Sequence, residues 1–144
     1  MTINQLINHP RKKKKRKLGV WFLDGKPQKK GVCVNRFTEN PKKPNSADRK
    51  LALIQIKIKP KGKTRPFKYY KKMGLNSNKK TYTIRAYLTG CNNKLEQFMD
   101  VLIKGDRRKD LISLHAAAIN GARDLPGTPD RKTARSKYGV KKNK

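Results

Sequence analysis

The chain has 144 residues, and its 39 Lys and Arg against 9 Asp and Glu give a formal net charge of +30. Hydrophobic residues make up 34% of it, which predicts one domain with a small core. Repulsion of this size destabilises a free compact fold, and nucleic acid is the natural counter-charge because its binding releases counterions. A membrane surface is a poorer partner, since no amphipathic basic helix of useful length and no apolar run of transmembrane length is present.

The charge is unevenly distributed along the chain. Residues 49–95 contain fourteen Lys or Arg and no acid, and residues 131–144 contain seven and no acid. Residues 96–130 hold six acids and five Lys or Arg, so this nearly neutral stretch is expected to pack. The like-charge blocks are expected to order on binding a polyanion.

The N-terminal residues predict a short helix followed by a basic arm. Thr2 and Gln5 have the spacing of a capping box, and His9-Pro10 ends the helix, which we interpret as a small docking element. Seven consecutive basic residues, Arg11–Lys17, then form an extended arm. For Trp21 we favour packing against the domain over stacking on a base.

Alternating apolar and polar residues predict an all-β fold. The clearest strand has Ile54, Ile56 and Ile58 alternating with polar residues, and a helical turn is expected within Leu95–Met99. Five short strands with a cationic surface favour a five-stranded oligonucleotide-binding-type barrel. The predicted strands are Val32–Phe37, Leu51–Ile58, Thr81–Leu88, Phe98–Ile103 and Ser113–Ala118.

We divide the chain into an N-terminal helix and basic extension (1–30), the barrel (31–123) and a basic C-terminal tail (124–144). The barrel would carry an insertion, Lys59–Lys80, that is much longer than a hairpin loop of two to five residues. Tyr69 and Tyr70 lie among cations in it, so it is either an RNA-binding finger that stacks bases or a lysine-rich expansion without order.

The connection Pro41–Lys50 is the most informative segment. Its two prolines restrict the backbone around Lys42 and Lys43, and Asn45 and Ser46 are expected to bond their own backbone. A stiff, protruding loop of cationic and small polar groups suits an RNA phosphate backbone and a shallow minor groove. The alternative is a solvated charged turn.

Catalytic and metal chemistry have little support. Cys33, Cys91, His9 and His115 lack the close spacing of a zinc site, and Cys33 is expected to be an ordinary buried thiol. Two cysteines make no disulfide framework, so a reducing compartment is the simpler interpretation. Two histidines and a lysine would suffice for RNA cleavage by general acid–base chemistry, as in a small ribonuclease, but nothing in the sequence positions the two histidines. We therefore expect no enzyme activity, no metal and no cofactor.

Several long strings occur in the order seen in the ribosomal protein S twelve family, the universal family of the small-subunit decoding centre. They are Thr2–Leu6, His9–Lys12, Gln28–Cys33, Pro41–Lys50, Asp130–Lys132 and Ala134–Val140. The resemblance covers nearly the whole chain apart from Lys59–Lys80, and it implies the same barrel. The chain departs from the family where Lys26 replaces a cysteine, where Asn92-Asn93-Lys94 replaces Gly-His-Asn, and in the loop Lys104–Leu111.

In that loop the strand is expected to end at Ile103 and the chain to turn on Gly105, with Asp110 beside three cations. The alternative is a charged hairpin tip with a local ion pair of little value. The resemblance aligns Lys109 and Asp110 with a decoding-site loop, but Ile112-Ser113 replaces Pro-Gly and His115 replaces Arg. These departures suggest a less rigid loop and make modification of Asp110 uncertain.

The resemblance implies a structural role in the small ribosomal subunit, with rRNA, the mRNA and tRNA of the aminoacyl site and other ribosomal proteins as partners. Neither a membrane partner nor a homo-oligomer is expected. The implied decoding-site residues are Lys42, Lys43, Pro44, Asn45, Ser46, Lys109 and Asp110. Contacts to the rRNA backbone are expected from Arg11, Lys12, Lys13, Lys14, Lys15, Arg16, Lys17, Arg49, Lys50, Arg131, Lys132, Arg135 and Lys137.

The alternative function is a free single-stranded nucleic-acid-binding protein or RNA chaperone that uses the barrel face. The departures from the family pattern, the Lys- and Asn-rich expansion and the absence of a leader suggest a mitochondrial ribosome, with plastid or bacterial cytoplasm as alternatives.

Overall fold

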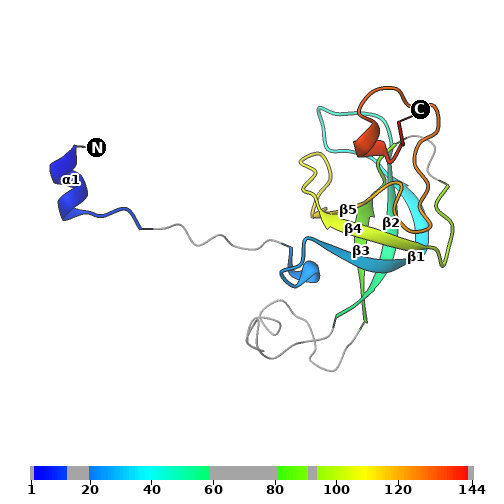
Figure 1. Cartoon of the computed structure of the whole chain (residues 1–144), viewed down its shortest axis with the longest axis horizontal. Helices are drawn as coiled ribbons and strands as arrows, with labels where there is room; N and C mark the ends of the chain where they lie inside the picture. The colour runs from blue at the N-terminus through cyan, green and yellow to red at the C-terminus, as the bar shows by residue number, and fades with distance from the viewer. Residues whose placement is uncertain (1, 13–19, 59–80, 91–93, 143–144) are drawn as a thin grey trace.

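Five strands close into a barrel in the computed structural model of the chain, which describes residues 2–12, 20–58, 81–90 and 94–142 (Figure 1). Around the barrel the strands follow the order β1-β2-β3-β5-β4; β3 and β5 are parallel and the other pairs antiparallel. This is the predicted oligonucleotide-binding-type barrel. The strands are β1 (Gln28–Glu39), β2 (Arg49–Lys57), β3 (Thr81–Tyr87), β4 (Asp100–Gly105) and β5 (Ala116–Ala118).

All five predicted strands exist, but their bounds differ from those predicted. β1 begins four residues before Val32 because Gln28–Val32 pairs with β4. Phe98 is in a turn with a positive φ of 65° and is 81% exposed, so the predicted fourth strand begins too early, and the turn there is not helical. β4 continues to Gly105, past the predicted end at Ile103.

The barrel core follows the predicted alternation. Ile54, Ile56, Val101 and Ile103 are fully buried, and β5 contributes three buried alanines. A second, smaller cluster joins Leu51, Leu111 and Leu114, with Phe37 and Tyr87 packed against it. This second cluster anchors the segment between β4 and β5 to the start of β2, and this contact positions the candidate site.

The N-terminal elements agree with their sequence signals. Helix α1 (Ile3–Asn8) has the predicted capping box between Thr2 and Gln5, and none of its residues is buried. The 3-10 helix η1 (Trp21–Leu23) packs on the barrel, where Trp21 makes edge contacts with Phe22 and Tyr82 at ring-centre distances of 6.0 and 5.7 Å. Packing is thus the role that the structure gives Trp21.

Among the helices that the structure describes, none is long and apolar enough to cross a membrane.

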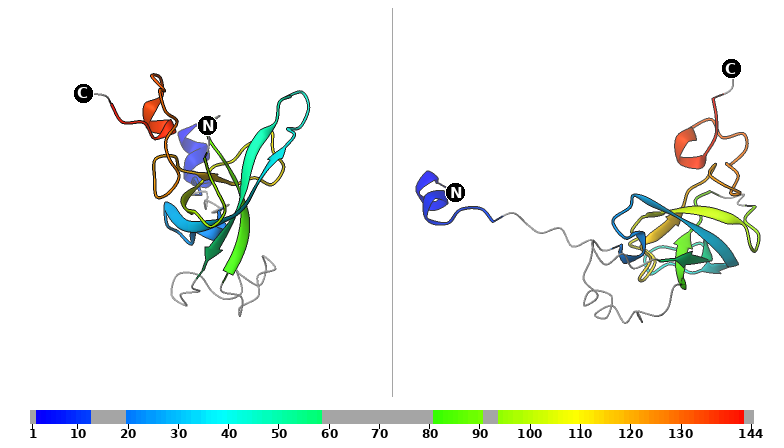
Figure 2. Two further views of the ribbon diagram at one scale, coloured as in Figure 1. Left: turned by 90° about the vertical axis from the view of Figure 1, so that its right-hand side faces the viewer. Right: turned by 60° about the horizontal axis from the view of Figure 1, so that its bottom comes forward.

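The segment after β5 folds back on itself. Leu125 is fully buried in the barrel core, and the 3-10 helix η2 (Arg135–Tyr138) ends at Gly139, which has a φ of +69°. The Thr128 N–H donates to the Tyr138 carbonyl at 3.0 Å. A Cβ at Gly139 would lie 2.5 Å from the Asn120 carbonyl carbon, so two stretches of backbone are in direct contact here. Figure 2 shows this segment close to one end of the barrel.

Candidate nucleic-acid interface

Two loops that the sequence places far apart meet at one end of the barrel. The first loop, residues 40–48, joins β1 to β2, and the second loop, residues 106–115, joins β4 to β5. The Lys42 N–H donates to the Asp110 carbonyl at 2.8 Å, and the Arg49 Nε donates to Asp110 Oδ2 at 3.1 Å. The structure therefore brings three of the predicted site residues together.

The first loop projects from the barrel, as Figure 2 shows, and its side chains are exposed from Lys42 to Asp48. The Asn45 N–H donates to the Lys42 carbonyl at 3.2 Å, and Arg49 Nη1 donates to the Ala47 carbonyl at 3.2 Å. The Lys43–Pro44 peptide bond is cis. The tight turn that we expected from the side chains of Asn45 and Ser46 is thus made by backbone groups and by Arg49. This leaves the polar side chains at the tip facing outward.

The second loop holds its three cations in different environments. Arg108 lies over the Tyr87 ring at 4.3 Å and pairs with Asp106 at 3.1 Å, whereas Arg107 and Lys109 are exposed. The expected local ion pair exists, but it belongs to Asp106. Asp110 pairs instead with Arg49, the first residue of β2, which directly follows the first loop. Lys109 is therefore left available for a ligand, while Arg108 stabilises the loop.

Arg85 of β3 is a contact that the sequence analysis missed. Its Nη1 lies 3.0 Å from Glu39 Oε2 and 3.2 Å from Oε1, and its Nη2 donates to the Ile112 carbonyl at 2.6 Å. The Arg85–Glu39 pair thus braces the second loop at the place where Ile112-Ser113 replaces Pro-Gly of the family pattern. Ser113 has a positive φ of 60°.

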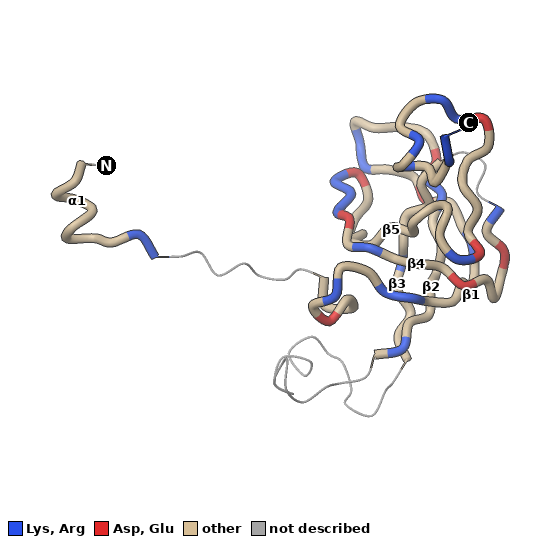
Figure 3. The backbone as a smooth tube through the Cα atoms, viewed as in Figure 1, with Lys and Arg blue, Asp and Glu red and all other residues tan. Residues whose placement is uncertain are grey.

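The C-terminal segment gathers a second group of predicted cations. Arg131 stacks over the Tyr138 ring at 3.8 Å, and a pocket of about 480 Å³ is lined by Arg131, Lys132 and Arg135, together with Lys141 and Lys142. Lys137 lies elsewhere, in a pocket that it shares with Lys104 and Arg108. Figure 3 shows Lys and Arg on the two loops and on this segment, toward the upper end of the barrel in that view. Three separate segments thus present positive charge.

Some predicted site residues lie outside the described residues. In the arm Arg11 and Lys12 are described and exposed, but Lys13, Lys14, Lys15, Arg16 and Lys17 are not described. The insertion 59–80 with its two tyrosines also lies outside, and so do Cys91, Asn92 and Asn93. Lys50 is described and exposed.

In the part of the chain that the structure describes, few side chains are placed for catalysis or for metal binding. There, no three His, Cys, Asp or Glu side chains are grouped in a way that could hold a metal ion. His9 caps the end of α1, whereas His115 immediately precedes β5. Cys33 is fully buried in β1, and this burial raises the pKa of its thiol. The arrangement is suited to holding a polyanion.

A small closed barrel with exposed cations on several loops is typical of nucleic-acid-binding proteins of the oligonucleotide-binding type. Residues 13–67 match the model of a family described as ribosomal protein S12/S23. The match includes β1, the first loop and β2. This match supports the predicted resemblance to the family. The family is one of the small ribosomal subunit, structural rather than enzymatic, with rRNA and other ribosomal proteins as partners.

Proposed function

We propose that the two loops bind rRNA at the decoding centre and support accuracy at the aminoacyl site. The observation that carries this proposal is the junction at Asp110, whose backbone and carboxylate hold Lys42 of the first loop and Arg49, the first residue of β2. A junction of this kind makes two cationic loops one surface.

In this proposal the tip of the first loop lies near the minor groove of the codon–anticodon helix of mRNA and tRNA. Pro44, Asn45 and Ser46 are exposed there and of a size to approach a shallow RNA groove, where 2′-hydroxyls are read by small polar groups. Lys42, Lys43 and Lys109 are exposed around them and would hold the surrounding phosphates. Arg11–Lys17, Lys50 and the cations of the C-terminal segment would neutralise further rRNA backbone.

Accuracy would follow from differential binding. RNA that closes around a correct codon–anticodon pair offers the loops a surface that open RNA lacks, so a rigid protein surface favours the closed state. A correct pair is then stabilised more than an incorrect one. The Asp110 junction and the Arg85 brace supply this rigidity.

The proposal is tested by purifying small subunits that contain the full chain and mapping RNA crosslinks to peptides. Crosslinks from residues 41–50 and 107–110 to decoding-region RNA are the expected result. Loss of the chain from subunits in a high-salt wash, with crosslinks spread over many RNAs, would instead support a free RNA-binding or chaperone protein.

For the compartment we propose a mitochondrial ribosome, with plastid and bacterial ribosomes as the alternatives. The support is the set of departures from the family pattern at Lys26, Asn92-Asn93-Lys94 and Ile112-Ser113, together with the basic insertion. Fractionation of the source cells, followed by detection of the chain in ribosomes of each compartment, tests it.

A further inference from the structure

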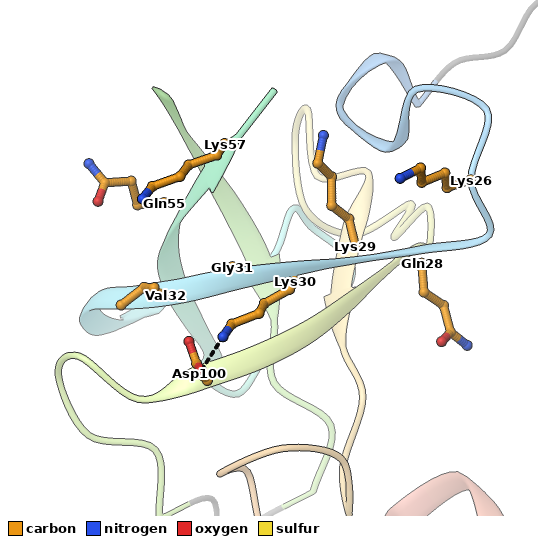
Figure 4. A pocket seen from close by; sticks show the side chains of 9 residues that line it. All are labelled: Lys26, Gln28, Lys29, Lys30, Gly31, Val32, Gln55, Lys57 and Asp100. Atoms are coloured by element: carbon orange, nitrogen blue, oxygen red, sulfur yellow. Dashed lines mark ion pairs between the residues drawn. The ribbon is translucent and has the colours of Figure 1, made fainter. Parts of the chain in front are cut away.

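A pocket of about 550 Å³ lies on the barrel beside β1 (Figure 4), and no residue of the two loops lines it. Its cationic residues come from two strands and from the turn before β1. They are Lys26, Lys29, Lys30 and Lys57. Gln28 and Gln55 add amide groups to the same lining. We call this feature the β1 pocket.

The lysines of the β1 pocket divide into two groups. Lys30 forms an ion pair with Asp100 of β4. In Figure 4 the Lys29 side chain rises on the opposite side of β1 from Lys30 and Asp100. Within the described part of the chain, no carboxylate within 4.0 Å forms an ion pair with Lys26, Lys29 or Lys57. These three ammonium groups are therefore available to an anion.

The position of Lys29 makes its charge costly without such an anion. Its side chain is half-buried, and this burial lowers the pKa of Lys29; nearby Asp24 raises that pKa in part, and Lys26 lowers it further. A cation that is partly removed from water and repelled by a neighbouring cation gains when an anion replaces the lost hydration. The β1 pocket thus has the electrostatics of an anion site.

The shape of the pocket depends on Gly31. This residue is buried, and a Cβ on it would collide with the Ile54 side chain and would lie 3.0 Å from the Gln55 carbonyl oxygen. β1 and β2 therefore approach closely behind the pocket. The register opposes Val32 to Gln55, so Lys30, Gln55 and Lys57 share one face of the two strands, and Lys29 lines the pocket from the other side of β1. A row of cations with amide donors and acceptors fits a phosphate–ribose chain better than a single small anion.

We propose that the β1 pocket binds the phosphodiester backbone of RNA, with Lys26, Lys29 and Lys57 as phosphate contacts and Gln55 as a contact to ribose hydroxyls. This proposal rests on the proposed binding of rRNA, but it assigns a separate contact on another part of the barrel. The protein would then hold RNA at the loops and at the side of β1 at once.

The first test uses small subunits that contain the full chain. Lysine acylation followed by peptide mass spectrometry compares the reactivity of Lys26, Lys29 and Lys57 in the subunit and in the free protein, and a lysine-to-RNA crosslinker identifies what protects them. Protection together with crosslinks to rRNA is expected. Acylation at the free-protein rate, or crosslinks to a protein alone, would overturn the proposal even where Lys42 and Lys43 crosslink to decoding-region RNA.

The second test decides the matter even if the chain fails to enter subunits. Binding of the full chain to a small-subunit rRNA transcript is measured over a range of salt for Lys29→Met, Lys57→Met and the control Lys94→Met, an exposed lysine outside the pocket. Each pocket variant is expected to lower the slope of log K against log salt by about 0.7–0.9, as the loss of one phosphate contact does. Slopes equal to that of Lys94→Met would contradict the proposal. Circular dichroism confirms that the variants fold.

Discussion

Arg49 and Asp110 are 61 residues apart in the chain, yet the Arg49 Nε donates to Asp110 Oδ2 at 3.1 Å. Both side chains are largely buried, at 27% and 19% exposure, so solvent screens this pair less than a surface pair. The Asp110 carbonyl also accepts from the Lys42 N–H at 2.8 Å. Asp110 of the second loop thus holds both Lys42 within the first loop and Arg49, where the first loop ends and β2 begins.

Replacing Asp110 with Asn should weaken this junction. The amide keeps the shape but loses the charge, so Arg49 is left without its anion, and the free energy of unfolding should fall by roughly 1–2 kcal/mol. Urea titration of Asp110→Asn, Arg49→Gln and the double variant measures the coupling between the two side chains. A coupling energy indistinguishable from zero would show that the junction depends on the backbone bond alone.

The Arg85 brace should control the mobility of the second loop. Arg85→Met removes the bonds to Glu39 and to the Ile112 carbonyl, so amide hydrogen exchange in residues 108–114 should speed up by about tenfold or more, as for a loss of 1–3 kcal/mol. Arg85→Lys should restore the protection only in part, because an ammonium lacks the planar fork of arginine. Arg107→Lys, an exposed change in the same loop, is the control. Unchanged amide hydrogen exchange in Arg85→Met would mean that the packing of Leu111 and Leu114 holds the second loop in place without the brace.

The barrel could be predicted from the sequence because its signals are local. Ile54 and Ile56 alternate with polar residues, and the capping box of α1 depends on two residues three apart. The start of β1 was missed since Gln28–Gly31 has poor strand propensity, and only pairing with β4 makes it a strand. Phe98 led to the opposite error. Aromatic residues favour strands, so the fourth strand was predicted to begin at Phe98, but this residue lies exposed in a turn.

The candidate site could be predicted only in its parts. Lys42, Arg49 and Asp110 were each singled out by local sequence, but no local pattern tells that Asp110 pairs with Arg49 rather than with its neighbouring cations. Glu39 and Arg85 were missed for the same reason, since 46 residues separate them. Acidic residues are rare in this chain. Glu39, an acid close to a predicted strand end, could therefore have been expected to pair with a nearby cation.

Lys42 is the side chain of the first loop whose replacement should change translation most directly. Lys42→Asn removes an exposed charge while leaving the Lys42 N–H bond to Asp110 possible, so the loop should keep its place and lose a phosphate contact. Altered misreading and an altered streptomycin response are expected for Lys42→Asn and Lys42→Arg. A reporter assay in ribosomes carrying each variant measures both. The matched control is Lys94→Asn; equal misreading in Lys42 and Lys94 variants would remove the first loop from the accuracy mechanism.

Cys33 should react slowly in the folded protein. Its thiol is fully buried, which raises its pKa and shields it from reagents, although nearby Arg36 lowers the pKa slightly. In a Cys91→Ser background, alkylation should proceed at the rate of global or local opening and accelerate in urea. Because the folded state holds the thiol proton more tightly, the contribution of Cys33 to stability is complete below the ordinary thiol pKa of 9.0 and declines as the pH rises above it. Rapid alkylation without urea would contradict the buried position.

Gly139 should tolerate no side chain, whereas Gly25 should tolerate one. Both have a positive φ, of 69° and 77°, so Ala costs each about 1–2 kcal/mol of backbone strain. At Gly25 a Cβ meets no atom within 4 Å, but at Gly139 it would lie 2.5 Å from both the carbon and the oxygen of the Asn120 carbonyl. Gly139→Ala should therefore detach the C-terminal segment from the loop around Asn120, and Gly25→Ala should not. Limited proteolysis after residue 126 distinguishes them: cleavage should increase in Gly139→Ala alone, and equal resistance in both variants would mean that the segment is not held by this backbone contact.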